Sequence, residues 1–345
     1  MKYEKWIDVT KGIGILLVIL GHNAFDQSFL TIIHAFNMPL FFFISGYLYH
    51  YRKYKQDPIY FIYQKFKRLV VPYFVTNVII LCTLILLSTF KLNSFDRNSP
   101  LKYLIGVFYG NGAPLNPSTI FTNSLSVPSW FLLGLFCASL ILYIIAYSHE
   151  KYGLICSSSL CFLVTLFGFK MSKYVFLPWS FDIACVSMVF MFSGYLANYY
   201  KINWLYNSFK SNLYNFFFVL LLFILISING PVDMNTRTYS NLFLFSIAGL
   251  LGTYLTIEFA KKISKKENLL TEMFAYFGKN SIFILLFHSF APIVFLDIIN
   301  VFINIKEVIF HSPILYSITM LVSSIVTIII IKRLPALDRI YSVRA

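Results

Sequence analysis

The chain has 345 residues, of which 58% are hydrophobic and only 12% are charged. The charged share is about half that of a typical soluble domain, and the mean hydropathy is +0.73. These values exclude an ordinary soluble globular protein and an intrinsically disordered one. Unbroken apolar runs at 79–88 and 216–228 also exclude an outer-membrane barrel, whose strands alternate apolar and polar residues. The sequence therefore predicts an all-α, polytopic membrane protein that forms one integral domain over residues 1–345.

The formal net charge is +14. In a membrane protein, such an excess is typical of cytoplasmic loops rich in Lys and Arg, and no basic block or aromatic motif indicates a nucleic-acid partner. The first apolar run, 12–20, has no small-residue cleavage site after it and predicts a retained span. The cysteines form no C-x-x-C pair and lie in or beside apolar runs, so we expect buried free thiols. They are Cys82, Cys137, Cys156, Cys161 and Cys185.

Apolar segments along the chain predict ten transmembrane helices. They lie at about 10–26, 30–49, 69–90, 129–148, 154–169, 178–198, 213–229, 239–260, 280–301 and 313–331. With the N-terminus in the cytoplasm, 21 Lys and Arg residues fall on inside segments and 7 on outside segments. This bias predicts that both termini are cytoplasmic. The longest outside loop, 91–128, could be a functional element or a plain connector.

The first predicted span carries ionisable residues on one face. Lys11 and His22 are eleven residues apart, so they lie about 20° apart around a helix and about 16 Å apart along it. Asp8 lies one turn before Lys11, and Asp26 lies one turn after His22. Because ionisable residues in a span usually face the bundle interior or a water-filled cavity, the stripe predicts a site. Alternatively, Lys11 extends its ammonium group to the inner interface, and His22 is a buried histidine with satisfied hydrogen bonds.

Two further segments repeat this pattern of polar residues. His34, Asn37 and Ser45 share one face of the second predicted span, and Pro39 between them is expected to bend the helix. Ser45 and Gly46 could equally serve close helix packing alone. In the basic loop that follows, Lys65 and Arg68 are three residues apart beside the inner interface. They predict a binding site for a phosphorylated cytosolic ligand, or else a topogenic or lipid-headgroup cluster. Later spans hold Asp182, Glu258, His288 and Asp297.

The segment 6–22 resembles the first span of membrane-bound acyltransferase family 3, in which a basic residue is followed by ten residues and then by His. Lys11 takes the basic position. Residues 38–46 resemble the second-span motif of the family, and residues 65–72 resemble its basic pair followed by Leu and Pro. Within the family, the chain is most similar to fucose 4-O-acetylase-like proteins of bacterial surface polysaccharide loci. Weaker similarities lie at Trp130-Phe131-Leu132, at 192–195, and at Asn280-Ser281 with His288.

The resemblance implies an O-acyltransferase of the bacterial inner membrane. Such an enzyme moves an acyl group, usually acetyl, from cytosolic acyl-CoA to a hydroxyl of a glycan. The glycan would be O-antigen, capsule or exopolysaccharide, or a lipid-linked precursor. We expect acetyl-CoA as the donor, contact with membrane lipid, and neither a metal nor a tightly bound cofactor. Close relatives often have His at the position of Asn37, whereas here His34 lies one turn earlier.

The resemblance also suggests roles for individual residues. Lys11, Lys65 and Arg68 would hold the CoA phosphates through charge-assisted hydrogen bonds. His22 would act as a general base on the sugar hydroxyl, or would carry the acetyl group as a nucleophile. The expected supporting or acceptor-binding residues are Asp8, His34, Ser45, Trp130, Asp182 and His288.

Two other functions remain open from the sequence. A transporter or flippase of lipid-linked glycans would also be polytopic, but such proteins often contain internal repeats and paired broken helices, and neither is apparent in the sequence. The other alternative is a non-catalytic partner in polysaccharide assembly, against which the intact spacing of Lys11 and His22 argues. No soluble-enzyme motif such as a Walker A sequence or G-x-S-x-G occurs.

Overall fold

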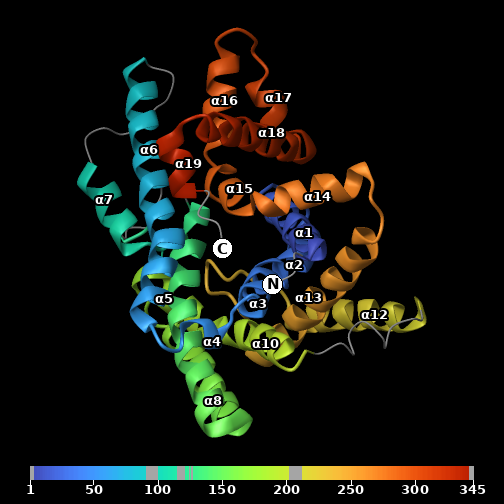
Figure 1. Cartoon of the computed structure of the whole chain (residues 1–345). Helices are drawn as coiled ribbons and strands as arrows, with labels where there is room; N and C mark the ends of the chain where they lie inside the picture. Colours follow the sequence, from blue (N-terminus) through green and yellow to red (C-terminus); the bar gives the residue numbers. More distant parts are fainter. Residues whose placement is uncertain are drawn as a thin grey trace.

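The structure, a computed structural model, describes residues 4–90, 100–114, 121–123, 125, 127–201 and 212–341. Within these ranges the chain is helical and has only two isolated β-bridges, which confirms the all-α prediction (Figure 1). The first helices are α1 (Lys5–Gly21), α2 (Gln27–His34), α3 (Asn37–Tyr47), α4 (Tyr51–Tyr54), α5 (Pro58–Lys65), the π-helix η1 (Phe66–Val70), α6 (Val71–Thr89) and α7 (Pro100–Tyr109). Next come the 3-10 helix η2 (Val127–Ser129), α8 (Trp130–Met171), the 3-10 helix η3 (Pro178–Ser180), α9 (Phe181–Val186) and α10 (Met188–Tyr199). The rest are α12 (Asn212–Asn229), α13 (Leu242–Ser264), α14 (Leu269–Lys279), α15 (Ser281–Phe287), α16 (Ala291–Asn300), α17 (Lys306–Phe310), α18 (Pro313–Lys332) and α19 (Pro335–Tyr341).

Several helical segments are long and apolar enough to cross a membrane. The described residues contain five: Gln27–Tyr47, Pro58–Thr89, Val127–Met171, Leu242–Ser264 and Pro313–Lys332. Two bent pairs raise the number to seven, α9 with α10 at 60° and α14 with α15 at 66°. The protein is therefore a polytopic membrane protein, whereas the count of ten spans and the orientation of the termini stay predictions. Part of the loop 91–128, which is predicted to face outside the cell, is not among the described residues, and neither are Lys2, Lys210 and Arg344 of the charge count.

Helix α8 contains both predicted spans 129–148 and 154–169 and reverses direction between them. Gly134 and Gly168 are 34 residues apart and would be about 51 Å apart in a straight helix. A Cβ atom on Gly134 would lie 3.6 Å from the Ser180 side chain, and one on Gly168 would lie 2.6 Å from the carbonyl oxygen of Asp182. The chain turns back at Gly153, whose φ of 83° suits glycine.

Besides 178–198, which is bent between α9 and α10, three predicted spans differ from the helices that form. The first helix begins at Lys5 and ends at Gly21, so Asp26 does not continue its stripe; instead its carboxylate caps α2 by accepting from Ser28 N at 2.9 Å. The predicted span 30–49 is broken between α2 and α3, because Pro39 has no N–H to donate to the carbonyl of residue 35. The predicted span 280–301 is broken between α15 and α16 at His288.

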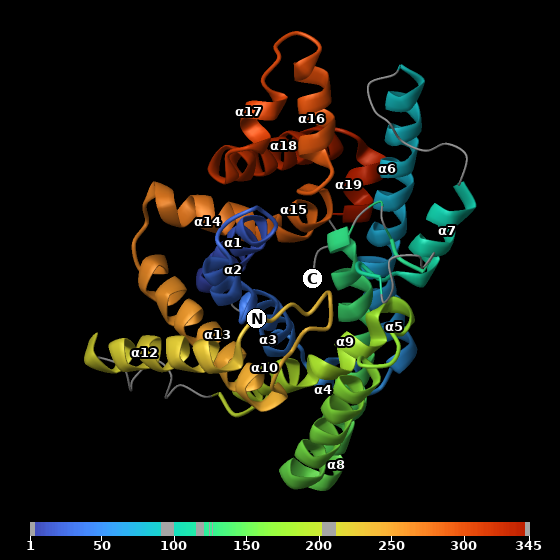
Figure 2. The same ribbon diagram turned by 180° about the vertical axis from the view of Figure 1, so that it is seen from behind.

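Close contacts between glycines and backbone fix α1 against α14. A Cβ atom on Gly12 would lie 1.9 Å from the carbonyl oxygen of Phe274, and one on Gly278 would lie 1.7 Å from that of Asp8. Larger side chains cannot occupy these positions, so the two backbones meet directly, as small residues permit in membrane bundles. Figures 1 and 2 show α1 enclosed by α3, α13, α14 and α15.

Close contacts between glycines and backbone also join α3 to α10. A Cβ atom on Gly46 would lie 1.8 Å from the carbonyl oxygen of Met191, and one on Gly194 would lie 2.0 Å from that of Phe43. The packing role expected for Gly46 is thus confirmed. Because the pairs 46 with 191 and 43 with 194 run in opposite directions along the chain, α3 and α10 pack antiparallel.

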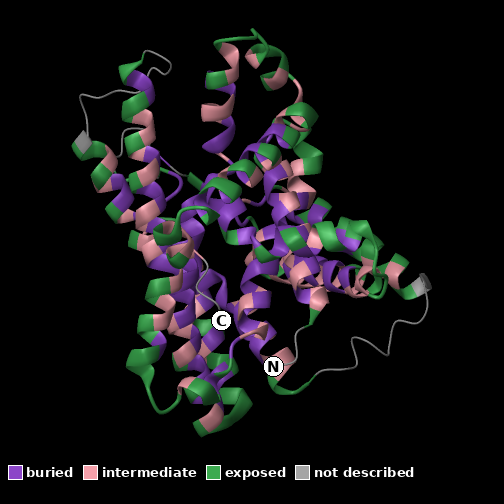
Figure 3. Ribbon diagram, turned by 45° about the horizontal axis from the view of Figure 1, so that its top comes forward, coloured by how far each residue is buried: buried purple, intermediate pink, exposed green. Residues whose placement is uncertain are grey.

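The distribution of buried and exposed residues is that expected of a membrane-embedded helical bundle. Buried residues gather at the centre of the bundle, and exposed ones form the periphery (Figure 3). Many peripheral side chains are apolar, for example Phe216 at 62% and Phe217 at 55% exposure on α12, which suits contact with lipid. The five cysteines are free, as predicted, but Cys82 and Cys156 are exposed. Their prediction as buried thiols was wrong, because apolar sequence in a membrane protein also faces outward.

Candidate functional site

Helix α1 ends at the centre of the bundle and carries His22 there. His22 is the residue after the last turn of α1, and its backbone N–H donates to the carbonyl of Ile19. The next residue anchors the turn, because Asn23 Nδ2 donates to Ile19 O at 3.0 Å and to Ser317 Oγ of α18 at 2.5 Å. The His22 side chain is exposed, and among the described residues neither of its ring nitrogens has a hydrogen-bond partner.

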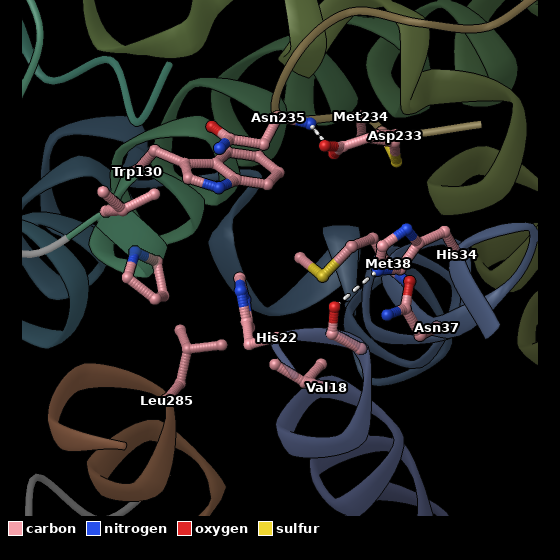
Figure 4. Close-up of a pocket in the computed structure, with 13 residues that line it drawn as sticks. Val18, His22, His34, Asn37, Met38, Trp130, Asp233, Met234, Asn235 and Leu285 are labelled. Atoms are coloured by element: carbon pink, nitrogen blue, oxygen red, sulfur yellow. Dashed lines mark hydrogen bonds between the residues drawn. The ribbon is translucent and has the colours of Figure 1, made fainter. Parts of the chain in front are cut away.

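His22 faces a pocket of about 200 Å³. This volume is below the range of about 300–1,000 Å³ that is typical of sites for drug-sized ligands, so the pocket suits the reacting ends of larger molecules. Figure 4 shows His22 pointing into the pocket from α1, with residues of the loop after α12 on the opposite side. The lining residues are Val18, Gly21, His22, His34, Asn37, Met38, Val127, Pro128, Trp130, Asp233, Met234, Asn235 and Leu285.

His288 lies against His22 but does not itself line the pocket. The two ring centroids are 5.0 Å apart, and the ring planes are inclined by 47°. His288 Nδ1 lies 3.0 Å from the carbonyl oxygen of Ile284 and 2.9 Å from that of Leu285. Since carbonyl oxygens only accept, Nδ1 must carry the proton and Nε2 must be a free acceptor. That Nε2 is buried without a partner among the described residues.

The break between α2 and α3 brings two more predicted residues to the pocket. His34 Nε2 donates to the carbonyl of Gly21 at 3.1 Å, which links α2 to the end of α1. Asn37, the first residue of α3, also lines the pocket. Ser45 does not: it is half-buried on α3, one residue before Gly46. The structure therefore does not bring Ser45 together with His22.

The predicted donor residues Lys11, Lys65 and Arg68 lie in one region of the bundle. Lys11 Nζ lies 3.7 Å from Asp8 Oδ1, one turn earlier on α1. Arg68 is close enough to repel the positive charges of both Lys11 and Lys65. Three cations held together without enough carboxylate to neutralise them favour an anionic ligand. The cluster joins α1 to the basic segment before α6, although the two are more than forty residues apart in the sequence.

A π-helix orients Arg68. The N–H of Val71 donates to the carbonyl of Phe66, five residues earlier, rather than to the residue four before it. The cause lies in the sequence, because Pro72 has no N–H for the carbonyl of Arg68 and interrupts the α-helical ladder. Single π-turns of this kind frequently occur at functional sites. Arg68 lies in the middle of the π-helix.

Trp130 lines the pocket from the start of α8. Its side chain is 4% exposed, and Gly112 fills the space beside it. A Cβ atom on Gly112 would lie 2.4 Å from Trp130 Cδ1 and 2.4 Å from Asn235 Oδ1. The indole is therefore closely confined, and this packing depends on a glycine of the 91–128 segment.

Asp182 does not reach the pocket. Its carboxylate forms a buried ion pair with Arg237, with Nε to Oδ2 at 2.7 Å and Nη2 to Oδ1 at 3.2 Å. It also accepts from the backbone N–H of Leu177 at 3.1 Å. Asp182 therefore contacts neither His22 nor the pocket directly; it holds Arg237 in the loop that supplies part of the pocket wall.

Sequence reasoning missed the residues of that loop. Asp233, Met234 and Asn235 line the pocket, and Arg237 is bound to Asp182 beneath them. The available signal was a short polar segment with one acid and one Arg between two apolar runs, on the side predicted to be outside. Within the described ranges, no group of three His, Cys, Asp or Glu side chains is placed to hold a metal ion.

Comparisons with known proteins identify the family. A family model described as an acyltransferase domain, that of acyltransferase family 3, matches residues 4–333. No curated protein and no solved structure matches the chain. The match spans nearly the whole chain, including Lys11, His22, Arg68 and His288. The chain therefore belongs to membrane acyltransferase family 3 and is an acyltransferase.

Proposed function

We propose that this protein is an inner-membrane O-acyltransferase of bacteria. It takes an acetyl group from cytosolic acetyl-CoA and places it on a hydroxyl of a cell-surface glycan or of its lipid-linked precursor. The observation that carries the proposal is the pairing of His22 with His288 beside a pocket at the end of α1. A histidine with unengaged ring nitrogens is suited to move the proton of a hydroxyl group.

The His22–His288 pair gives each ring a distinct task. His288 is held by two backbone carbonyls in the tautomer that leaves Nε2 as an acceptor. When the His22 ring turns towards it, His288 Nε2 accepts the N–H of His22 and leaves the other nitrogen of His22 unprotonated. A base oriented by a third group is the usual arrangement for activating a nucleophile. Hydrogen bonds of this kind often tighten only when the substrate is bound.

The reaction can take two routes, both balanced by His22. In the direct route, the hydroxyl oxygen attacks the thioester carbon, His22 accepts the hydroxyl proton, and the carbon–sulfur bond breaks. The proton then passes to the CoA thiolate. In the carrier route, a nitrogen of His22 attacks the thioester carbon, the carbon–sulfur bond breaks, and the ring proton of the acyl-imidazolium passes to the CoA thiolate. The sugar hydroxyl then attacks the acetyl carbon, the carbon–nitrogen bond breaks, and the hydroxyl proton returns to the imidazole.

The donor would approach from the side of Lys11. This residue lies about 16 Å before His22 along α1, and the phosphates of CoA would bind there with Lys65 and Arg68. The thioester at the far end of the pantetheine arm would then lie near His22. Trp130 contributes an aromatic surface on the other side of the pocket. Such a surface supports a sugar ring, because it combines a large apolar face with a fixed orientation.

The proposal can be tested by acetyl transfer across a vesicle membrane, with the donor and the acceptor on opposite sides. The purified protein is reconstituted in vesicles with [¹⁴C-acetyl]-CoA on one side and alkali-de-O-acetylated surface polysaccharide on the other. We expect label on the polysaccharide only when the donor is on the side of Arg68. His22→Ala should lose at least about 10²-fold of the rate. His311→Ala is the matched control, because His311 is an exposed histidine directly after α17, outside the pocket.

Three outcomes would refute or refine this function. Unchanged transfer by His22→Ala would remove its catalytic role. Polysaccharide that crosses the vesicle membrane without label would favour a transporter. Label that stays on the protein when the acceptor is omitted, and that His22→Ala abolishes, would select the carrier route over the direct route.

A further inference from the structure

The outer turn between α12 and α13 faces His22 across the pocket. We propose that Asp233 and Asn235 of this turn bind hydroxyl groups of the acceptor sugar and so select which hydroxyl reaches His22. The inference rests on the proposed function, because it assigns the acceptor side of the same site. Both residues line the pocket, and Figure 4 shows them with Trp130 on the side opposite His22.

Within the turn, one carboxylate oxygen of Asp233 accepts a hydrogen bond and the other does not. Asp233 and Thr238 form an antiparallel bridge, with backbone N–O distances of 2.8 and 2.9 Å. Oδ1 of Asp233 accepts from the backbone N–H of Asn235 at 2.8 Å. Among the described residues, its other oxygen has no donor. A carboxylate only accepts hydrogen bonds, so this oxygen suits a donor such as a sugar hydroxyl.

Asn235 presents a second group without a partner. Its side-chain Oδ1 is buried and has no hydrogen bond among the described residues. Buried polar groups are almost always paired, and an exception calls for an explanation such as a ligand. The explanation fits its position, because Asn235 lies beside Trp130, with Gly112 packed against both. A carboxylate, an amide and an indole thus converge on one side of the pocket, which matches a polyhydroxylated ring.

Arg237 holds this turn rigidly. Besides Asp182, its guanidinium donates to Asn111 Oδ1 at 2.9 Å and to the backbone carbonyl of Asn235 at 2.7 Å. It also stacks 4.0 Å from the ring centroid of Phe176. The residue has a φ of 59°, a sparsely populated conformation that persists only where surrounding contacts enforce it. The turn is therefore preorganised, which lowers the ordering cost of binding.

The test measures acceptor binding separately from transfer. The probe is surface polysaccharide from the same cells, de-O-acetylated with alkali, and binding to the purified full-length protein is measured by isothermal titration. Asp233→Asn preserves the turn, because the amide oxygen still accepts from Asn235 N, but removes the charge. We expect about tenfold weaker binding or more, since a hydrogen bond to a charged group is lost. Asn235→Ala should also weaken binding.

Two controls give the result its meaning. Thr236→Ala changes an exposed residue of the same turn that does not line the pocket, and it should bind as the wild type does. Radiolabelled acetyl-CoA should bind all three variants with wild-type affinity. Unchanged polysaccharide binding by Asp233→Asn, or no binding by the wild type, would overturn the inference. A fall in kcat with an unchanged KM for the polysaccharide would also overturn it and assign Asp233 an electrostatic effect on His22.

The same measurements separate this inference from the proposed function. Polysaccharide binding that depends on Asp233, together with no acyl transfer in vesicles, would refute the function and support the binding site. Acyl transfer that depends on His22, together with binding that is indifferent to Asp233 and Asn235, would support the function and refute this assignment.

Discussion

The imidazole rings of His22 and His288 lie with their centroids 5.0 Å apart, although 266 residues separate them in the sequence. His22 follows the end of α1, and His288 follows α15 where an expected long span breaks. One ring is exposed in the pocket and the other is fully buried with its Nδ1 proton fixed by two carbonyls. Under the proposed function, this asymmetry would make His22 the reactive ring and His288 the orienting one.

The positioning role proposed for His288 can be tested by rescue. His288→Ala should lower kcat by about 10²-fold, in the range lost with general-base assistance, and should leave the KM for acetyl-CoA unchanged. His288→Gln should recover part of the rate, because a side-chain carbonyl can replace the Nε2 acceptor. Steady-state kinetics of the reconstituted protein provide the measurement. Equal kcat values for the Ala and Gln variants would indicate a role in packing only.

Removal of Arg68 tests the donor cluster. Arg68→Ala should raise the KM for acetyl-CoA by about tenfold or more, because a charge-assisted hydrogen bond to phosphate is lost. Lys67→Ala is the matched control: it removes one positive charge from the same π-helix, but Lys67 is exposed. Equal effects of the two variants on KM would mean that the segment contributes only its net charge, as a topogenic or lipid-binding cluster does.

Single cysteines test the orientation predicted by the charge count. Lys53 and Thr236 are both exposed, and they are predicted inside and outside the cell, respectively. In a background in which Ser replaces the native cysteines, an impermeant thiol reagent should label Thr236→Cys in intact cells and Lys53→Cys only after lysis. The reverse labelling pattern would invert the orientation and would place the Arg68 cluster outside.

The buried ion pair of Asp182 and Arg237 should stabilise the outer turn strongly. Asp182→Ala or Arg237→Ala leaves the partner charge buried and unpaired, which costs about 3–5 kcal/mol of unfolding free energy. Thermal unfolding of the detergent-purified protein should therefore begin at a lower temperature in each single variant. Because the double variant leaves no unpaired charge, its loss should be smaller than the sum of the two single losses. Additive losses would show that the pair is not coupled.

Sequence alone was sufficient where the determining interactions are local. The spacing of Lys11 and His22 places both on one face of α1, because the helical repeat is fixed by the backbone. The bend expected at Pro39 follows from the missing N–H of proline. Apolar composition identified the membrane setting because lipid requires it over every span.

Hydropathy could not locate the breaks that build the site. Apolar residues flank the interruptions at 35–36 and at His288, so a sliding average passes across them. The sequence also could not show which apolar residues are exposed, because lipid-facing and core-facing residues in a membrane bundle are equally apolar. Cys82, which is exposed, is an example.

The sequence by itself determined the helical membrane class, the family, and one half of the candidate site along α1. Only the tertiary structure decided that His288 is the partner of His22, that Asp182 serves Arg237 and not the pocket, and that Asp233 and Asn235 form the opposite wall. In these pairings, the two partners are separated by between 55 and 266 positions in the sequence. They depend on how helices and loops pack in three dimensions, which no local periodicity records.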